Sequence, residues 1–398
     1  MNNYLALLVT SLASFIAVAW IYPKILKIAV DRNLCDKPGE RKLQKSPVPV
    51  LGGVAVAFGI FVGLQAGVVF CHLTSTAFLI PAFSILSALI VMLYVGAVDD
   101  LIELSPRIRF CIEILLVAGI ICGSDACIDS LHGLWGIGEF SWWIGVPLTV
   151  FASVGIINAI NMIDGVNGLS SSLCILCSTL FGFVFLQGGV LTIAIINFAM
   201  AASLVPFLIH NVIGLRSKMF IGDAGTMMMG ILMSYDVIQL LRTDTAPHWQ
   251  QMGGQGFGLV ALTIAILALP VADTLRVMTQ RILRHQSPFS PDKTHLHHVL
   301  MEYSFSHAIT TIVEVLIAVL VFLSWYIAYK LGGSIEVQLY VVVLAAMLLV
   351  WGLYAYLSSR RTVRTGIAWR LRSLFARLRQ GETEWWRKAQ EWVDGDSK

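Results

Sequence analysis

Residues 78–100 read FLIPAFSILSALIVMLYVGAVDD. The uncharged stretch 78–98 is long enough to cross the hydrocarbon core of a bilayer as a helix, which takes about 20 apolar residues. Its residues are continuously apolar instead of alternating between apolar and polar, which excludes a strand of a membrane β-barrel. The stretch ends on two adjacent acids, Asp99 and Asp100, and the same design of an apolar run with an acid at its end recurs along the chain.

The whole chain shares the composition of this segment. Of its 398 residues, 57% are hydrophobic and 13% are charged, whereas a soluble domain carries about 25% charged residues. We therefore predict an all-α polytopic membrane protein with about 11 transmembrane helices, with the lipid bilayer as a partner and no nucleic acid. The expected spans lie near residues 4–22, 48–70, 78–98, 110–123, 142–161, 169–187, 189–209, 227–241, 257–275, 309–329 and 337–357.

The orientation follows from the distribution of basic residues. Lys and Arg concentrate between the first two spans, after the ninth span and after the last span, and are scarce in the intervening segments of the opposite face. Since basic loops face the cytoplasm, we expect the N-terminus outside and the C-terminus inside. The expected location is the cytoplasmic (inner) membrane of a bacterium.

Two parts of the chain differ in character. Residues 1–358 hold all the spans and form the expected transmembrane domain. Residues 359–398 form a basic tail, in which apolar side chains recur at helical spacing, as in an amphipathic helix on anionic headgroups. The alternative is a solvated tail that only maintains the orientation. The tail residues in this pattern are Ile367, Leu371, Leu374, Phe375 and Leu378, followed by Trp385, Trp386 and Trp392.

Four acidic motifs fall on the predicted cytoplasmic face. Acids beside membrane spans are costly and usually functional, so their collection at one face indicates a site for a cation and a polyanion. The motifs are Asp99-Asp100, Asp164 in NAINMIDGVNGLS (158–170), Asp223 in FIGDAGT (220–226) and Asp292 in SPFSPDKTHLHH (287–298).

Each acidic motif also has a purely structural interpretation. Asp99 and Asp100 are either a solvated helix end or a pair whose repulsion is relieved by a hard cation such as Mg²⁺. The Asp164 motif is either a helix end with turn glycines, or a polar face on which Asn161, Asp164 and Asn167 continue the helix at a spacing of three. Asp223 is an N-cap for the following span, a metal ligand, or both.

The three histidines of the fourth motif are His295, His297 and His298. They suggest zinc, but no HExxH pattern or cysteine partner accompanies them. We favour contact with phosphate.

Taken in order, these motifs resemble the polyprenyl-phosphate N-acetylhexosamine-1-phosphate transferase family. The similarity covers about residues 1–330 and includes DKPGERKLQKSPVPVLGG (36–53). Within the family, SPFSPDKTHLHH looks like the branch that uses UDP-N-acetylglucosamine (UDP-GlcNAc). The sister branch that transfers phospho-MurNAc-pentapeptide carries a triple histidine followed by an acid, which His298-Val299 does not match.

The resemblance implies that the transmembrane domain, residues 1–358, is a transferase domain, and it implies a reaction and the residues that carry it. Undecaprenyl phosphate would attack the β-phosphate of UDP-GlcNAc, giving undecaprenyl-diphosphate-GlcNAc and UMP, with Mg²⁺, or Mn²⁺ in its place, as cofactor. The implied catalytic residues are Asp99, Asp100, Asp164 and His295. The implied metal ligands are Asp223 and Asp100, and the implied substrate-binding residues are Lys45, Asn161, Asn167, His297 and His298. A homodimer is an expectation from the family alone.

Two positions depart from the family pattern, and some alternatives stay open. Asn167 stands where many relatives have a second Asp, and Gln44 stands where His is common. Another UDP-N-acetylhexosamine, such as UDP-MurNAc-pentapeptide or UDP-GalNAc, is the alternative donor. An ion-coupled transporter is the remote alternative, because Glu113, Asp236 and Glu314 lie inside predicted spans without an assigned role.

Overall fold

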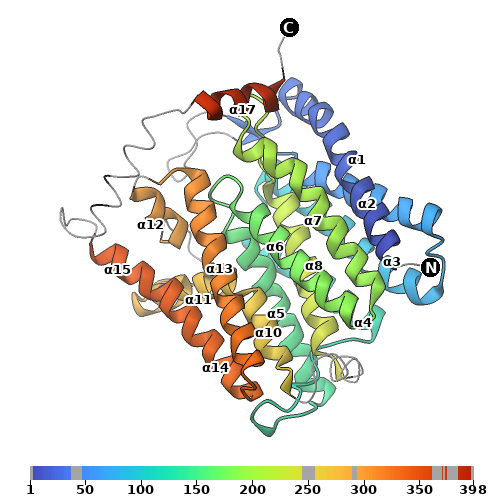
Figure 1. The fold of residues 1–398 in the computed structure, drawn as a ribbon, viewed down its shortest axis with the longest axis vertical. Helices are drawn as coiled ribbons and strands as arrows, with labels where there is room; N and C mark the ends of the chain where they lie inside the picture. The colour runs from blue at the N-terminus through green and yellow to red at the C-terminus, as the bar shows by residue number, and fades with distance from the viewer. Residues whose placement is uncertain are drawn as a thin grey trace.

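The computed structural model describes residues 3–36, 47–243, 256–288, 294–303, 305–360 and 384–395, and the single residues 370 and 373. Within these ranges, nine helices are long and apolar enough to cross a membrane, so the protein is a multi-pass helical membrane protein (Figure 1). Lys45, Gln44, Asp292 and the tail residues Ile367, Leu371, Leu374, Phe375 and Leu378 lie outside the described residues. What we infer for these residues from the sequence remains a prediction.

The helices run nearly without interruption through the described residues. The first half comprises α1 (Asn3–Asp31), β1 (Cys35–Asp36), β2 (Val48–Pro49), α2 (Gly52–Cys71), α3 (Thr76–Ile102), α4 (Pro106–Ser124), η1 (Leu134–Gly136), α5 (Trp142–Met162), α6 (Leu169–Gln187) and α7 (Leu191–Val212). The second half comprises α8 (Gly222–Leu241), α10 (Leu259–Ile266), α11 (Ala268–Leu283), α12 (Leu296–Glu302), α13 (His307–Lys330), α14 (Ile335–Ala346), η4 (Met347–Gly352, a π-helix), α15 (Leu353–Ser359) and α17 (Glu384–Asp394).

Every expected span falls on a helix, but two expectations need correction. The span expected at 257–275 is not straight: α10 and α11 meet at a bend of 77°. The span expected at 110–123 corresponds to α4, which carries Arg107, Arg109 and Glu113 and is not among the nine apolar helices. Of these three side chains, Arg109 belongs to the site described below.

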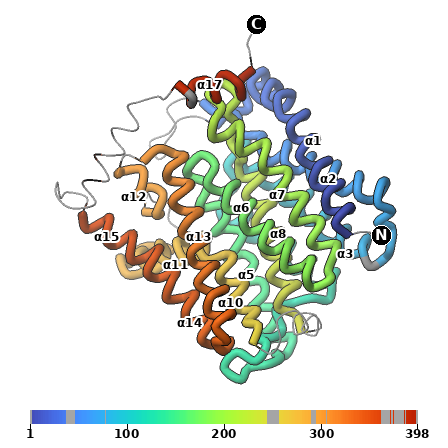
Figure 2. The backbone as a smooth tube through the Cα atoms, in the orientation of Figure 1, coloured from blue at the N-terminus to red at the C-terminus, as the bar shows by residue number. Residues whose placement is uncertain are grey.

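Helix α8 is the centre of the bundle. It is buried along its whole length and packs against α2, α3 and α5 (Figure 2). Small residues allow this close approach, as they do in membrane helix pairs generally. A Cβ atom on Gly230 would lie 2.7 Å from the Cα atom of Ile157 in α5, and one on Gly96 would lie 2.5 Å from the backbone of Ala224.

A short two-stranded sheet connects the N-terminal region to the start of α8. Strands β1 and β2 pair antiparallel, with Asp36 opposite Val48. The Phe220 N–H donates to the Pro49 carbonyl at 2.7 Å, and the Gly52 N–H donates back to the Phe220 carbonyl at 2.9 Å. The segment before α8 is therefore held like a third strand, which fixes where α8 begins.

The three acids without an assigned role are buried within the helices. The carboxylates of Glu113 and Asp236 accept hydrogen bonds from Asn158 at 2.6 Å and from Asn197 at 2.8 Å. Glu314 is 2% exposed in α13. Burial of an acid against an amide of a neighbouring helix links the helices, and this accounts for Glu113 and Asp236 as packing contacts.

The contact between α3 and α8 yields a stability prediction. We expect Gly96→Ala to lower the thermal unfolding temperature of the detergent-solubilised protein by several degrees, because the added methyl group must displace the backbone of Asp223 and Ala224. Gly119→Ala is the matched control: it is also a helical glycine, but nothing lies within 4 Å of the new Cβ atom. Equal unfolding temperatures for the two variants would contradict this packing.

Candidate active site

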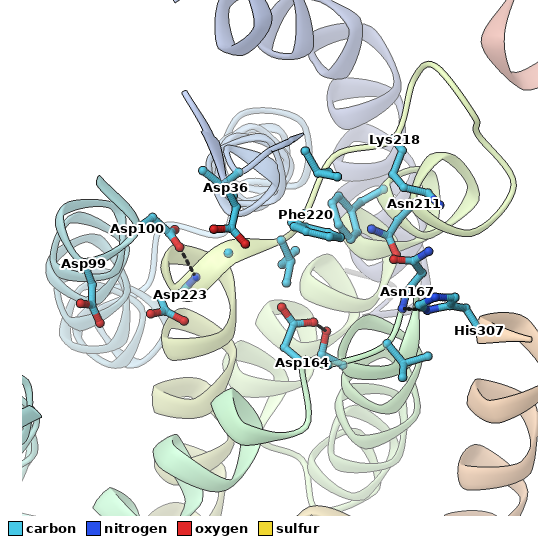
Figure 3. Close-up of a pocket in the computed structure, with 18 of the residues that line it drawn as sticks. Asp36, Asp99, Asp100, Asp164, Asn167, Asn211, Lys218, Phe220, Asp223 and His307 are labelled. Carbon is cyan, nitrogen blue, oxygen red and sulfur yellow. Dashed lines mark hydrogen bonds between the residues drawn. The ribbon is translucent and has the colours of Figure 1, made fainter. Parts of the chain in front are cut away.

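A cavity of about 780 Å³ opens at the end of the bundle where α3 and α5 end and α8 begins (Figure 3). This volume is within the range of small-molecule sites, roughly 300–1,000 Å³. Polar side chains from six segments far apart in the sequence meet in it. They are Asp36, Asp99, Asp100, Glu103, Arg109, Asp164, Asn167, Ser170, Asn211, Lys218, Asp223, His298 and His307.

The carboxylate of Asp100 joins α3 to the first turn of α8. It accepts hydrogen bonds from the backbone N–H groups of Asp223 at 2.9 Å and of Ala224 at 3.1 Å. First-turn N–H groups lack partners within their own helix and carry the positive end of its dipole, so a carboxylate there is stabilised. The N-cap alternative for Asp223 is wrong: Ile221 occupies the N-cap, and the capping carboxylate comes from Asp100.

Arg109 is the cation that faces this cluster. Its guanidinium lies 3.1 Å from the carboxylate of Asp99, 3.7 Å from that of Asp223 and 3.9 Å from that of Glu113. Asp99 also accepts from the Leu104 N–H at 2.7 Å. Asp99 is therefore almost fully engaged, whereas the Asp223 side chain is 36% exposed and faces the cavity.

Asn161, Asp164 and Asn167 do not continue a helix, because α5 ends at Met162. They nevertheless meet at the site. Asn161 donates to the Asp223 carboxylate at 2.8 Å, Asp164 accepts from the Ser170 hydroxyl at 2.5 Å, and both Asp164 and Asn167 line the cavity. The break in the helix thus directs the two loop residues to the cavity and leaves Asn161 to orient Asp223.

The end of the cavity away from Asp99 has a different character. Lys218, Asn211 and Phe220 lie there in Figure 3, with Asn167 and His307 beside them. The Asn167 N–H bonds to His307 Nδ1 at 3.2 Å. An aromatic ring, amides and a single cation offer stacking and hydrogen bonds, in contrast to the carboxylates at the other end.

Of the three histidines, only His298 lines the cavity. His295 and His297 are buried behind it, at 5% and 1% exposure. Burial and the neighbouring histidines hold the pKa of His297 well below its usual range, so its ring is neutral. The catalytic role of His295 and the substrate contact of His297 stay predictions, with both rings placed in the wall of the site.

A buried acid orients His295. Its Nδ1 lies 2.8 Å from the carboxylate of Asp273, which also accepts from Arg276 at 2.6 Å and from the Leu296 N–H at 3.2 Å. A carboxylate can only accept, so Nδ1 of His295 carries the proton and donates it. This contact fixes the orientation of the His295 ring at the N-cap of α12.

The charges of the cavity do not balance. Its lining includes six acids (Asp36, Asp99, Asp100, Glu103, Asp164 and Asp223) and two side chains of Lys or Arg, Arg109 and Lys218.

No group of three or more His, Cys, Asp or Glu side chains within the described ranges is arranged as a ready-made metal site. This donor set suits Mg²⁺, which is usually held by one or two carboxylates together with substrate phosphates and water. Asp223 and Asp164 carry carboxylate oxygens that face the cavity and fit this role, and Asp100 retains lone pairs beyond its two backbone contacts.

Several lining residues were not predicted from the sequence. Arg109 and Asp36 had detectable signals, because Arg109 is a cation ten residues after an acid pair and Asp36 opens the motif at 36–53. Lys218, Asn211 and His307 had none, since only the fold brings them to the cavity.

Comparison with known proteins shows the family of the chain. Residues 82–241 match the family described as Glycosyl transferase family 4. A Bacillus subtilis (strain 168) protein named probable undecaprenyl-phosphate N-acetylglucosaminyl 1-phosphate transferase is 30% identical over 318 residues, 79% of this chain and 83% of its own. Undecaprenyl-phosphate alpha-N-acetylglucosaminyl 1-phosphate transferases from Yersinia pestis and Escherichia coli (strain K12) are similar as well. They are 30% identical over 362 residues (89% of this chain, 90% of the relative) and 28% identical over 365 residues (89% of each).

The helical bundle and the acid-lined cavity at one of its ends define a polytopic membrane protein with a polar site. The chain belongs to Glycosyl transferase family 4, as one of the polyprenyl-phosphate N-acetylhexosamine-1-phosphate transferases, which the order of its motifs also indicated.

The burial of Asp164 predicts a pH-dependent cost to stability. Burial, together with the negative charge of Asp223, raises the pKa of Asp164 to about 7 against the lowering effect of Ser170, whereas an unfolded Asp titrates near about 3.9. The folded state therefore binds more protons than the unfolded state between these two pH values. The free energy of unfolding falls as the pH rises from about 4, and this loss is complete once the pH has passed about 7. In EDTA, Asp164→Asn should unfold a few degrees above the parent protein at pH 8.

At pH 5 the gain should shrink, because Asp164 is then protonated and neutral in the folded parent protein too. Thermal unfolding at the two pH values measures the difference. A gain of equal size at both would contradict a buried, charge-repelled Asp164.

Proposed function

We propose that this protein transfers N-acetylglucosamine 1-phosphate from UDP-GlcNAc to undecaprenyl phosphate, giving undecaprenyl-diphosphate-GlcNAc and UMP. The observation that carries the proposal is one cavity with two chemically different ends, at the end of a membrane bundle. The relatives named above support both the lipid acceptor and the sugar. The reaction is that of a phosphoglycosyltransferase at the first membrane step of a cell-surface glycan pathway.

The two ends of the cavity suit the two halves of the donor. Phe220 offers a face on which a uracil ring can stack, and the amides of Asn167 and Asn211 offer the hydrogen bonds that such a ring needs. Lys218 lies beside them as the cation of that end. The uridine therefore occupies this end, and the diphosphate extends toward Asp164 and Asp223.

Mg²⁺ is the cofactor of the proposal. Asp223 and Asp100 hold it, with Asp164 facing the same space. The chemistry that the ion supplies is neutralisation of the diphosphate and stabilisation of the leaving UMP. Without such a cation, a cavity with six acids and two bases would repel two polyanionic substrates.

The residues of the chain position the reaction and have little proton transfer to perform. The second pKa of a phosphate monoester is near 6, so the acceptor is already mostly dianionic at neutral pH. An oxygen of the lipid phosphate attacks the β-phosphorus, a new P–O bond forms, and the bond from that phosphorus to the bridging oxygen breaks, with both electrons leaving on UMP. Arg109 stays paired with Asp99 and limits the repulsion on the incoming phosphate, and no proton needs to be removed by Asp99.

The cavity faces the cytoplasm of a bacterium in this proposal. The segment that follows α1 starts at the cavity, because Asp36 lines it. In the sequence this segment continues with Lys37, Arg41, Lys42 and Lys45, which supports this orientation under the positive-inside rule. An N-terminus outside and a C-terminus inside follow from it. The soluble donor then arrives from the cytoplasm, and the polyprenyl tail of the acceptor stays among the lipids.

Release of UMP by the purified protein with undecaprenyl phosphate and Mg²⁺ tests the proposal. UDP-GlcNAc should support release, and UDP-GalNAc and UDP-MurNAc-pentapeptide should not. Asp223→Asn should slow release by roughly 10²- to 10³-fold, the usual effect of removing one electrostatic contact to a reacting group.

Asp125→Asn is the matched control, because Asp125 is an exposed acid in the turn that ends α4, away from the cavity lining. It should leave the rate unchanged. Release with another donor alone would replace the sugar in the proposal. Release that persists in Asp223→Asn at the parental rate would remove Asp223 from the site.

A further inference from the structure

The loop between α7 and α8 brings Lys218 to the cavity. Lys218 lines the end that carries Asn211 and Phe220, and the Asn211 side chain donates to the Met219 carbonyl at 2.8 Å. Residues 213–221 of this loop are not helical, so the position of Lys218 depends on what holds the residues just before it.

The side chain that holds them is Asp394, the last residue of α17. Its carboxylate accepts hydrogen bonds from three consecutive backbone N–H groups, those of Leu215 at 3.2 Å, Arg216 at 3.0 Å and Ser217 at 3.0 Å. The Ser217 hydroxyl adds a fourth at 2.7 Å. Successive N–H groups that converge in this way form an anion-binding nest, and here the anion is supplied by the C-terminal end of the same chain.

Other contacts make this loop a defined structure. The Tyr22 hydroxyl of α1 donates to the Ser217 carbonyl at 2.8 Å, and the Tyr22 ring stacks on His210 at 4.3 Å between centroids. Gly214 leaves room for the turn, because a Cβ atom there would lie 2.5 Å from the His210 carbonyl oxygen and 3.4 Å from Asp394. Helix α17 lies across this end of the bundle in Figure 1, beside the end of α7.

The charges favour the same arrangement. Burial raises the pKa of Asp394, but the hydrogen bonds from Arg216 and Ser217 outweigh it, and the pKa lies below its ordinary value. Burial lowers the pKa of Lys218, and the nearby negative charge of Asp394 opposes this. Asp394 is therefore ionised and helps to keep Lys218 a cation.

We infer that Asp394 is a positioning residue for the donor end of the cavity: by holding residues 215–217, the C-terminal helix α17 fixes Lys218 against the nucleotide part of the donor. Lys218 touches the substrate, and Asp394 acts through it. This inference rests on the proposed function, because it assigns the Lys218 end to UDP-GlcNAc. Helix α17 therefore helps to position the donor, a role separate from the membrane attachment expected for the tail.

A double-mutant cycle on the full-length protein tests the inference, with UMP release as the readout. Asp394→Ala should raise KM for UDP-GlcNAc by roughly 5- to 10-fold, the value of about one charge-assisted hydrogen bond. KM for undecaprenyl phosphate and kcat should change by less than about twofold. Lys218→Ala should have a similar effect. The double variant should be no worse than Lys218→Ala alone, because residues that act through one contact are not additive.

Glu391→Ala is the matched control, since Glu391 is an exposed acid of the same helix whose partner is Arg387, one turn earlier. It should leave both KM values unchanged. Amide hydrogen exchange at residues 215–217 should quicken in Asp394→Ala and not in Glu391→Ala, which separates local loosening from general unfolding.

Unchanged KM in Asp394→Ala, or effects of the two substitutions that multiply in the double variant, would overturn the positioning role. A general loss of kcat together with faster exchange throughout the bundle would also overturn it, since that is the signature of a purely structural contact. Failure of the parent protein to release UMP from UDP-GlcNAc would count against the proposed function instead.

Discussion

The contact on which the site depends is the carboxylate of Asp100 at the first turn of α8. The first N–H groups of α8 have no partner within their own helix and need one from elsewhere in the protein. Asp100 provides that partner from the end of α3. The same contact sets Asp223 beside Asp99, which brings Arg109 and Asn161 to the cluster. The acid cluster is thus a consequence of completing a buried helix end.

Among the described residues that line the cavity, this arrangement leaves more acidic side chains than Lys and Arg side chains to neutralise them. Arg109 contacts three carboxylates at once, and Asp164 accepts a hydrogen bond from the Ser170 hydroxyl. In the proposed reaction, a divalent cation and the substrate phosphates would offset this charge, so its cost lies where ligand binding would relieve it. Stability and catalysis therefore make opposite demands on residues such as Asp164.

The sequence was sufficient for an all-α membrane fold and for four of the six acids that line the cavity, Asp99, Asp100, Asp164 and Asp223. It was insufficient for Asp36 and Glu103 and for how the acids are paired. Long apolar runs report helices directly, so each expected span falls on a helix, although the bend of 77° between α10 and α11 has no local sequence signal. Arg109 lies just before the span expected at 110–123, although α4 begins at Pro106, so this residue had no role assigned from the sequence. Lys218, Asn211 and His307 reach the cavity only through tertiary packing. Asp394 was beyond prediction for the same reason, because its partners lie 177 to 179 residues earlier.

The most direct test of the account is the position of a bound divalent cation. Mn²⁺ can be located by its anomalous scattering in crystals of the protein grown with UMP. The account predicts one Mn²⁺ site, with an oxygen of Asp223 at about 2.0–2.2 Å and Asp100 or Asp164 on the same side. A site at His297 or His298 with Asp223 unoccupied, or UMP bound at full occupancy with no cation near the acids, would contradict it.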